Sequence, residues 1–287
     1  MPELPEVHAI TRILDRRLTG NTIAAGHLVW FSVLKTYDPP LEALAGLEIT
    51  GVRRYGKFVD IDAQGIHLVF HLARAGWVTW YDKVPAAVPR PGKSGLALRI
   101  ALEDGSGFSL TEAGTQRHLA VYVVNDPADV AGIAALGPDP LAEGFTAADL
   151  HRILSDAGRS QVKGLLRDQK VLAGIGNAYS DEILHAAGLS PFTPANSLGE
   201  SGATGLLGHI RQVLSAAIQA TDNRELSQLK DSKRASMQVH GRAGRPCPVC
   251  GTVIAEVSFA DSSLQYCPGC QTGGKVLADR RMSKLLK

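Results

Sequence analysis

All four cysteines of this 287-residue chain fall into two short motifs near its end. Cys247 and Cys250 form one C-x-x-C pair, Cys267 and Cys270 form a second, and sixteen residues separate the pairs. This spacing is typical of a zinc ribbon, in which four thiolates close a tetrahedral site and leave no position for catalysis. Two disulfides are the alternative. Because no signal peptide or long apolar run indicates an oxidising compartment, we expect one structural Zn²⁺ per chain.

The other end of the chain carries a candidate catalytic pair. Removal of Met1 before a small residue would leave Pro2 as an N-terminal secondary amine, with the Glu3 carboxylate directly beside it. An α-amino group titrates at about 7.7 to 8.0, well below lysine, so a useful fraction is nucleophilic near neutral pH. Such an amine attacks electrophilic carbons, for example a sugar C1′ or a carbonyl, and a secondary amine yields a charged iminium. The alternative is that this Pro/Glu-rich start only leads into a helix.

Positive charge gathers toward the C-terminal end. The net charge is only +2, but residues 224–287 hold eleven Lys and Arg against five Asp and Glu. The tail contributes Lys275, Arg280, Arg281, Lys284 and Lys287. A basic region around a zinc ribbon indicates a polyanion-binding surface, and the alternative is a solvated tail without a ligand. No segment is long enough to span a bilayer, so we expect a cytoplasmic protein without a membrane partner.

Hydrophobic periodicity predicts a helix and then a strand-rich region. Val7, Ile10, Leu14 and Leu18 lie on one helical stripe that ends at Gly20. Short β-prone segments separated by turn residues follow at 49–52, 58–61, 66–70, 96–100 and 119–124. Their spacing favours an antiparallel sandwich, which we expect Trp30, Trp77 and Trp80 to fill.

Beyond residues 137–140, which read Gly-Pro-Asp-Pro, the period becomes helical. Helices are expected at 146–154, around 162–166, at 178–187 and around 206–218. The glycines of residues 171–177 would let backbone N–H groups approach an anion such as a DNA phosphate at a helix start. A turn between helices also needs glycine for its own geometry, so that alternative stays open.

Together these motifs resemble the formamidopyrimidine-DNA glycosylase / endonuclease VIII family. The matching segments are residues 2–7 (Pro-Glu-Leu-Pro-Glu-Val), 53–57 (Arg-Arg-Tyr-Gly-Lys), 168–170 (Asp-Gln-Lys), 174–177 (Gly-Ile-Gly-Asn) and the cysteine pairs, in one order along nearly the whole chain. The resemblance implies an α+β multidomain fold. An N-terminal antiparallel β-sandwich with an N-terminal helix would span residues 1–130, a helix-two-turn-helix domain 131–240, and a zinc finger with a basic tail 241–287.

The resemblance also implies a function in base-excision repair. Pro2 would attack C1′ of a damaged nucleotide and form a Schiff base, Glu3 would protonate the sugar ring oxygen, and Lys57 would bind phosphate and assist β-elimination. Gly176 and Asn177 match the phosphate-binding turn of the family. The partner would be double-stranded DNA with damaged bases or abasic sites, bound by a monomeric, nucleoid-associated protein.

Two other functions fit the same sequence. A non-catalytic binder of damaged or abasic DNA could keep this scaffold, and a zinc-ribbon module could be fused to an unrelated enzyme. Lys163 matches a family lysine that faces the lesion strand. This match favours DNA contact, whether the protein is an enzyme or a non-catalytic binder. Retention of Pro2, Glu3 and Lys57 favours an enzyme with glycosylase and AP-lyase activity.

The chain departs from the family at positions that contact the lesion or its partner base. Arg74 replaces a methionine, and the segment from Glu112 to Arg117 lacks the family's arginine and wedging phenylalanine in place. Ser94 and Ser262 replace a DNA-contacting histidine and the arginine associated with a second elimination, and the loop at residues 226–237 is short. We therefore predict β-elimination as the favoured cleavage and a lesion preference different from that of the 8-oxoguanine enzymes.

Overall fold

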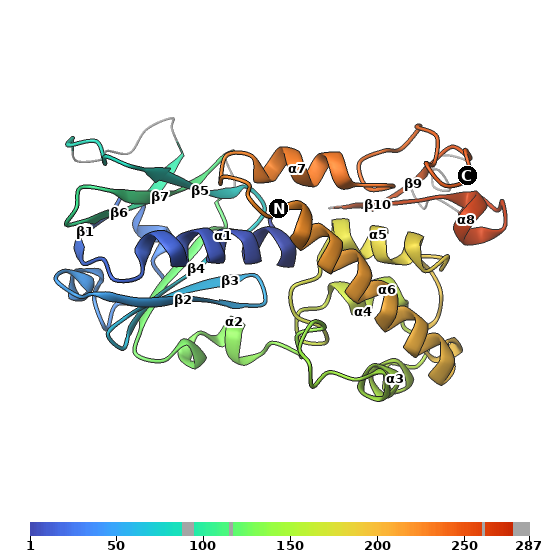
Figure 1. The fold of residues 1–287 in the computed structure, drawn as a ribbon. Coiled ribbons are helices and arrows are strands. Elements are labelled where there is room, and N and C mark those ends of the chain that lie inside the picture. Colours follow the sequence, from blue (N-terminus) through green and yellow to red (C-terminus); the bar gives the residue numbers. More distant parts are fainter. Residues whose placement is uncertain (88–94, 115–116, 260–261, 278–287) are drawn as a thin grey trace. The chain divides into compact units, whose positions relative to one another are not determined.

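The computed structural model describes residues 1–87, 95–114, 117–259 and 262–277 (Figure 1). They form two compact units, Met1–Leu136 with Thr221–Lys230, and Gly137–Ala220 with Asp231–Lys287. The domain limits expected at residues 130 and 240 stay a prediction. Several positions considered in the sequence lie outside the described residues, namely Ser94, Thr115, Gln116 and the tail cations Arg280, Arg281, Lys284 and Lys287.

The first unit is an antiparallel β-sandwich, as the sequence predicts. One sheet has the strand order β2-β3-β4-β8 and the other β1-β6-β7-β5. The strands are β1 (Ile23–Leu28), β2 (Ile49–Tyr55), β3 (Phe58–Ala63), β4 (Ile66–His71), β5 (Gly76–Tyr81), β6 (Leu96–Leu102), β7 (Gly107–Glu112) and β8 (Ala120–Val124). Buried residues of both sheets form one continuous apolar core, so the two layers stabilise each other.

Helix α1 (Leu4–Leu18) packs against β2 and β3 and belongs to the same core (Figure 1). A proline in its first turn and the acidic Glu6 favour the helix start, and Arg16 and Arg17 suit its last turn. Its predicted apolar stripe is buried along its whole length. The chain leaves the helix through Gly20 at φ +84°, a left-handed conformation that suits glycine.

Residues 221–230 return to the first unit and complete its core. Leu226 and Leu229 are buried within the sandwich cluster. The indole Nε1 of Trp77 donates to the Leu226 carbonyl at 3.2 Å. Arg17 of α1 pairs with Glu225 at 2.7 Å. The short loop expected at residues 226–237 thus begins within the core of the first unit, and most of it is helical, since Leu229–Ser236 form α7.

The second unit holds the predicted helices and the cysteine hairpin. Its helices are α3 (Ala147–Asp156), α4 (Val162–Arg167), α5 (Asn177–Ala186) and α6 (Gly199–Ala220). Helix α7 (Leu229–Ser236) follows and begins in the returning segment. The hairpin consists of strands β9 (Ala255–Ser258) and β10 (Ser263–Tyr266), and α8 (Pro268–Thr272) comes after it. Reciprocal hydrogen bonds between Thr146 and Asp149 open α3. Within the described ranges, no helix has both the length and the apolarity needed to cross a membrane.

Leu229→Ala should destabilise the first unit by about 2–5 kcal/mol, because it leaves a cavity in a closed core. Phe31→Ala is the control, since Phe31 is 84% exposed and its truncation should change the free energy of unfolding little. Urea unfolding monitored by tryptophan fluorescence measures both. Equal, small effects would show that residues 221–230 do not belong to the sandwich core.

Candidate functional site

The N-terminal residues are fixed by the start of α1. Glu3 is the N-cap residue and only 2% exposed, and Pro2 before it is also buried. The backbone N–H of Glu3 donates to Glu6 Oε2 at 2.8 Å, one half of a capping box. The two interpretations of this segment are thus compatible, because the residues that begin the helix also hold the candidate catalytic pair in place.

Lys57 reaches the same end of the first unit as Glu3. Helix α1 and strand β2 run antiparallel. Gly20 and Asn21, just after α1, bond to Ile49 at the start of β2. Further back in the helix, Asp15 Oδ1 accepts from Val52 N at 2.9 Å. From Asp15 back to Glu3 the helix extends about 18 Å at its usual rise. From Val52 to Tyr55 the strand extends about 10 Å in the same direction, and the turn that carries Lys57 lies beyond Tyr55. Glu3 and the turn that carries Lys57 therefore lie toward one end of the unit, where Figure 1 shows the start of α1 and the β2–β3 turn.

The turn that carries Lys57 is tight and buried. Gly56 and Lys57 connect β2 to β3, with Gly56 at φ +55°. Lys57 is 7% exposed. The His71 ring packs on Phe58 with centroids 4.8 Å apart, and burial first and the Lys57 charge second lower the pKa of His71 to about 4. Lys57 is thus a cation in a site with little water, beside a neutral imidazole.

Neutral His71 helps to shape the turn that presents Arg74. Its Nδ1 accepts the backbone N–H of Ala73 at 3.2 Å, which requires that this nitrogen carries no proton. Ala73 adopts φ +48°, and Gly76 N bonds to the Leu72 carbonyl at 2.8 Å. A side chain at Gly76 would lie 2.2 Å from that carbonyl oxygen, so only glycine fits. Arg74 lies exposed in this constrained turn.

Glu112 and Arg117, at the ends of the segment that lacks the family's wedge residues, both make contacts within the first unit. The buried Glu112 carboxylate accepts the backbone N–H groups of His118 and Leu119, each at 3.0 Å. The Arg117 guanidinium lies 3.2 Å from the centroid of the Trp30 ring. This arginine therefore packs against the sandwich of its own unit.

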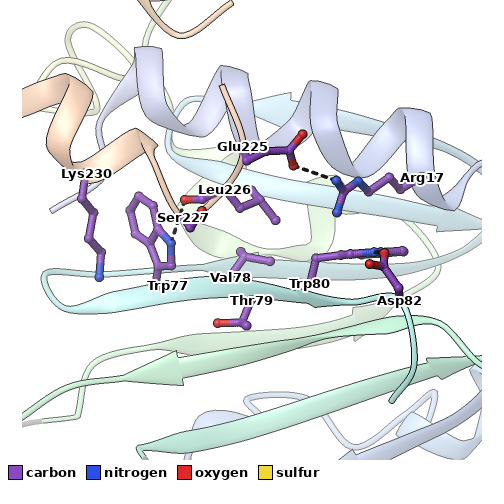
Figure 2. A pocket seen from close by; sticks show the side chains of 10 residues that line it. All are labelled: Arg17, Trp77, Val78, Thr79, Trp80, Asp82, Glu225, Leu226, Ser227 and Lys230. Carbon is purple, nitrogen blue, oxygen red and sulfur yellow. Dashed lines mark hydrogen bonds and ion pairs between the residues drawn. The ribbon is translucent and has the colours of Figure 1, made fainter. Parts of the chain in front are cut away.

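A pocket of about 590 Å³ lies beside β5 in the first unit (Figure 2). Lys230 Nζ lies 4.4 Å from the Trp77 ring centroid, and the Arg17 guanidinium 5.0 Å from that of Trp80. Trp30 is buried in the core as expected, whereas Trp77 and Trp80 pack against the core and also line this pocket. Lys230 belongs to the returning segment 221–230, and Arg17 pairs with Glu225 of that segment. The two cations therefore connect both tryptophans to the returning segment.

In the second unit, the glycine turn before α5 is held by Gln169. Gly174 N donates to Gln169 Oε1 at 2.9 Å, and Gln169 Nε2 donates to the Ile175 carbonyl at 2.7 Å. Gly176 is the N-cap residue of α5 and Asn177 its first residue. The Asn177 amide donates to the Ser263 carbonyl at 2.8 Å and so joins the turn to β10.

Lys163 occupies a buried polar network. It is 4% exposed, and its Nζ donates to Asp181 Oδ1 at 2.6 Å, to Ser180 Oγ at 2.8 Å and to the Asn177 carbonyl at 3.3 Å. Asp181 also accepts from His240 Nδ1 at 2.7 Å. A buried charge needs such partners. Lys163 thereby ties α4 to the first turns of α5, the helix that carries Asn177.

The cysteine hairpin gathers its four thiols as the spacing predicts. Cys247 and Cys270 lie 3.9 Å apart and Cys250 and Cys267 3.3 Å apart, sulfur to sulfur. Burial raises the pKa of Cys267 and of Cys270, while hydrogen bonds from Thr252 and neighbouring thiols lower that of Cys250 to about 6. Four clustered sulfurs with these separations fit one tetrahedral structural zinc ion.

His185 of α5 also reaches the thiols, which the sequence did not reveal. Its Nε2 lies 3.3 Å from Cys247 Sγ, although the two residues are 62 positions apart. No motif spacing in the sequence links this histidine to the cysteines. Burial lowers its pKa, so the ring is neutral at pH 7.

Comparison with known families covers most of the chain. Residues 1–118 match the formamidopyrimidine-DNA glycosylase N-terminal domain, residues 136–227 its H2TH domain, and residues 244–273 a zinc finger found in FPG and IleRS. The last match agrees with the zinc site formed by the four thiols.

Individual proteins give the same similarity. An uncharacterised formamidopyrimidine-DNA glycosylase-like protein of Mycobacterium tuberculosis is 52% identical over 153 residues, 53% of this chain and 95% of that protein. The formamidopyrimidine-DNA glycosylase of Herpetosiphon aurantiacus is 33% identical over 94% of this chain and all of its own length. The Lactococcus lactis enzyme, solved noncovalently bound to DNA containing an AP site, superposes with a TM-score of 0.82 at 25% identity, covering 94% of this chain and 99% of that one.

The lowered pKa of His71 predicts acid sensitivity. An unfolded histidine takes up a proton near pH 6.5, whereas folded His71 does so near pH 4, so its contribution to stability is complete above pH 6.5 and lost as the pH falls toward 4. The stability advantage of wild type over His71→Gln should shrink by about 3 kcal/mol between pH 7 and pH 4.

Urea unfolding at several pH values measures this difference. Lys57→Met should weaken the dependence, because the neighbouring positive charge is part of its cause. A constant difference between wild type and His71→Gln across this range would contradict a neutral, buried His71.

Proposed function

The chain belongs to the formamidopyrimidine-DNA glycosylase family, and from this premise we propose that it excises damaged bases from double-stranded DNA and nicks the strand at the resulting abasic site. The observation that carries the proposal is the arrival of Glu3 and Lys57 at one end of the first unit, beside the N-terminal proline. The family models match the N-terminal domain, the H2TH domain and the zinc finger in one chain, which argues against a zinc module fused to an unrelated enzyme.

The proposed chemistry begins at Pro2 after removal of Met1. Its nitrogen forms a bond to C1′ of the damaged nucleotide, the glycosidic bond breaks, and the electron pair leaves with the base, which gains a proton. Glu3 protonates the ring oxygen as the sugar opens, so the product is an iminium between Pro2 and C1′. Loss of a C2′ proton then expels the 3′ phosphate by β-elimination, and water hydrolyses the iminium to release the chain.

Lys57 supplies the positive charge for the elimination. Its burial beside a neutral imidazole reduces screening by water, which strengthens its attraction for a phosphate. A cation placed before the reaction stabilises the departing phosphate without solvent reorganisation. We assign Lys57 to the phosphate on the 3′ side of the lesion.

The turn at the start of α5 is proposed to hold the DNA backbone. The Asn177 amide nitrogen carries two hydrogens, of which one bonds to the Ser263 carbonyl and the second suits a phosphate oxygen. The start of α5 favours an anion through its backbone dipoles, and Gly176 allows close approach. Lys163 supports this turn through the Asn177 carbonyl and Asp181.

Lesion preference should differ from that of the 8-oxoguanine enzymes. Arg74 lies exposed in a rigid turn where the family places methionine, so we propose that its guanidinium contacts the base left unpaired when the damaged nucleotide leaves the stack. Ser262 stands in place of the arginine associated with a second elimination, which favours a nick by β-elimination alone.

Borohydride should trap the protein covalently on duplex DNA containing an abasic site, because the reagent reduces an iminium to a stable amine. Pro2→Gly is the nucleophile control, and Glu3→Gln should slow base release by about 10²–10⁴-fold through loss of the acid. Denaturing gels count adducts and nicks, and mass spectrometry of the intact chain establishes that Met1 is removed. A shifted but uncleaved and untrapped abasic duplex would instead identify a non-catalytic binder on the same scaffold.

Arg74→Ala should change activity by an amount that depends on the base opposite the lesion. A lost bidentate base contact is worth about 1–3 kcal/mol, or roughly 5- to 150-fold in kcat/KM, for the preferred opposite base. Arg152→Ala, which removes an exposed arginine of α3, controls for the loss of charge. A lesion panel with all four opposite bases measures the pattern, and a uniform loss across them would assign Arg74 to the DNA backbone.

A further inference from the structure

The C-terminal half of helix α5 contacts the cysteine end of the hairpin. His185 Nε2 lies 3.3 Å from Cys247 Sγ, and these residues are 7% and 3% exposed. Beyond the helix, the Gln271 side chain donates to the Leu189 carbonyl at 2.8 Å and accepts from Cys267 N at 2.8 Å. The histidine is therefore held against the thiols by contacts on both sides of the site.

Five candidate donor atoms lie around a site that has four positions. His185 Nε2 and the sulfurs of Cys247, Cys267 and Cys270 lie within 4.8 Å of one another, and Cys250 Sγ lies 3.3 Å from Cys267 Sγ. A zinc ion bound by four thiolates at about 2.3 Å places neighbouring sulfurs about 3.8 Å apart. The sulfurs of Cys247 and Cys270 are 3.9 Å apart and those of Cys250 and Cys267 3.3 Å apart, near or below that value. Two C-x-x-C pairs at this spacing form the complete ligand set of a zinc ribbon, so we assign the four positions to the cysteines. His185 is left with a different role.

We propose that His185 positions the zinc site by donating an Nε2–H hydrogen bond to the Cys247 thiolate. A zinc-bound thiolate carries no hydrogen, so the imidazole must provide it, and Nε2 is the nitrogen that faces the sulfur. The Cys270 backbone N–H bonds to Cys267 Sγ at 3.4 Å in the same manner on the other knuckle. Thr252 also donates to Cys250, so each knuckle has at least one donor that offsets the negative charge of its sulfurs.

The hydrogen bond matters because the site carries excess negative charge. Four thiolates around Zn²⁺ leave a net charge of −2, which is costly to bury without donors. Partners that bond to metal ligands typically change metal affinity by about 10- to 100-fold. The contact also makes zinc retention depend on α5, the helix whose other end carries Asn177.

Competition for zinc with a chromophoric chelator tests the proposal on the full-length protein. His185→Phe should weaken zinc binding by about 10- to 100-fold, and His185→Gln, which keeps an N–H donor, should recover much of that loss. His209→Phe, on a half-buried histidine of α6, is the matched control and should leave zinc affinity unchanged. Equal affinity in wild type and His185→Phe would overturn the proposal.

A second measurement uses the wild-type chain, so it does not depend on whether a variant folds. With ¹¹³Cd in place of zinc, the Nε2–H proton of His185 should show a weak scalar coupling to the metal through the Cys247 sulfur. A large one-bond coupling between ¹¹³Cd and Nε2, with no proton on that nitrogen, would identify His185 as a direct ligand and overturn the proposal. No coupling to this ring would overturn it as well.

Discussion

The packing of α1 along β2 is the constraint on which the candidate active end of the first unit depends. Chain termini are ordinarily mobile, and a mobile amine would be a poorly placed nucleophile. Here Glu3 is the N-cap residue of the helix, the apolar stripe of the helix is buried, and Asp15 bonds to the strand beside it. Pro2 and Glu3 are therefore positioned by a whole helix, and burial of apolar side chains further along the helix supplies the free energy that orders them.

Helix α5 has the corresponding role in the second unit. Asn177, Asp181 and His185 are spaced four residues apart, so they lie on one face of the helix. That face bonds to β10, to His240 and to the cysteine hairpin. A hairpin with so few buried apolar residues cannot form a sufficient core alone. Zinc and the polar face of α5 supply the stabilising contacts that the small apolar core of the hairpin does not provide.

The sequence predicted the sandwich, α1, the helices of the second unit and the cysteine site, because periodicity and spacing are local signals. It missed β1, β5 and β7, where Gly and polar residues interrupt the alternation, and it missed α7. It also missed His185, whose partner lies 62 residues further along the chain. The resemblance singled out Lys163, but only the fold reveals its buried partner Asp181. Contacts between residues far apart in the sequence cannot be predicted from the spacing of motifs.

The matches and the departures from the family fall on different kinds of structure. Glu3 caps a buried helix, and Lys57 sits in a two-residue turn whose geometry the flanking strands determine. Arg74, by contrast, is an exposed side chain on a turn that is held by its neighbours, through the His71–Ala73 bond and the close approach at Gly76. Replacement at position 74 leaves those contacts intact. If Arg74 contacts the unpaired base as proposed, substrate preference can change at this position at little cost in stability, while the proposed catalytic residues stay tied to the core.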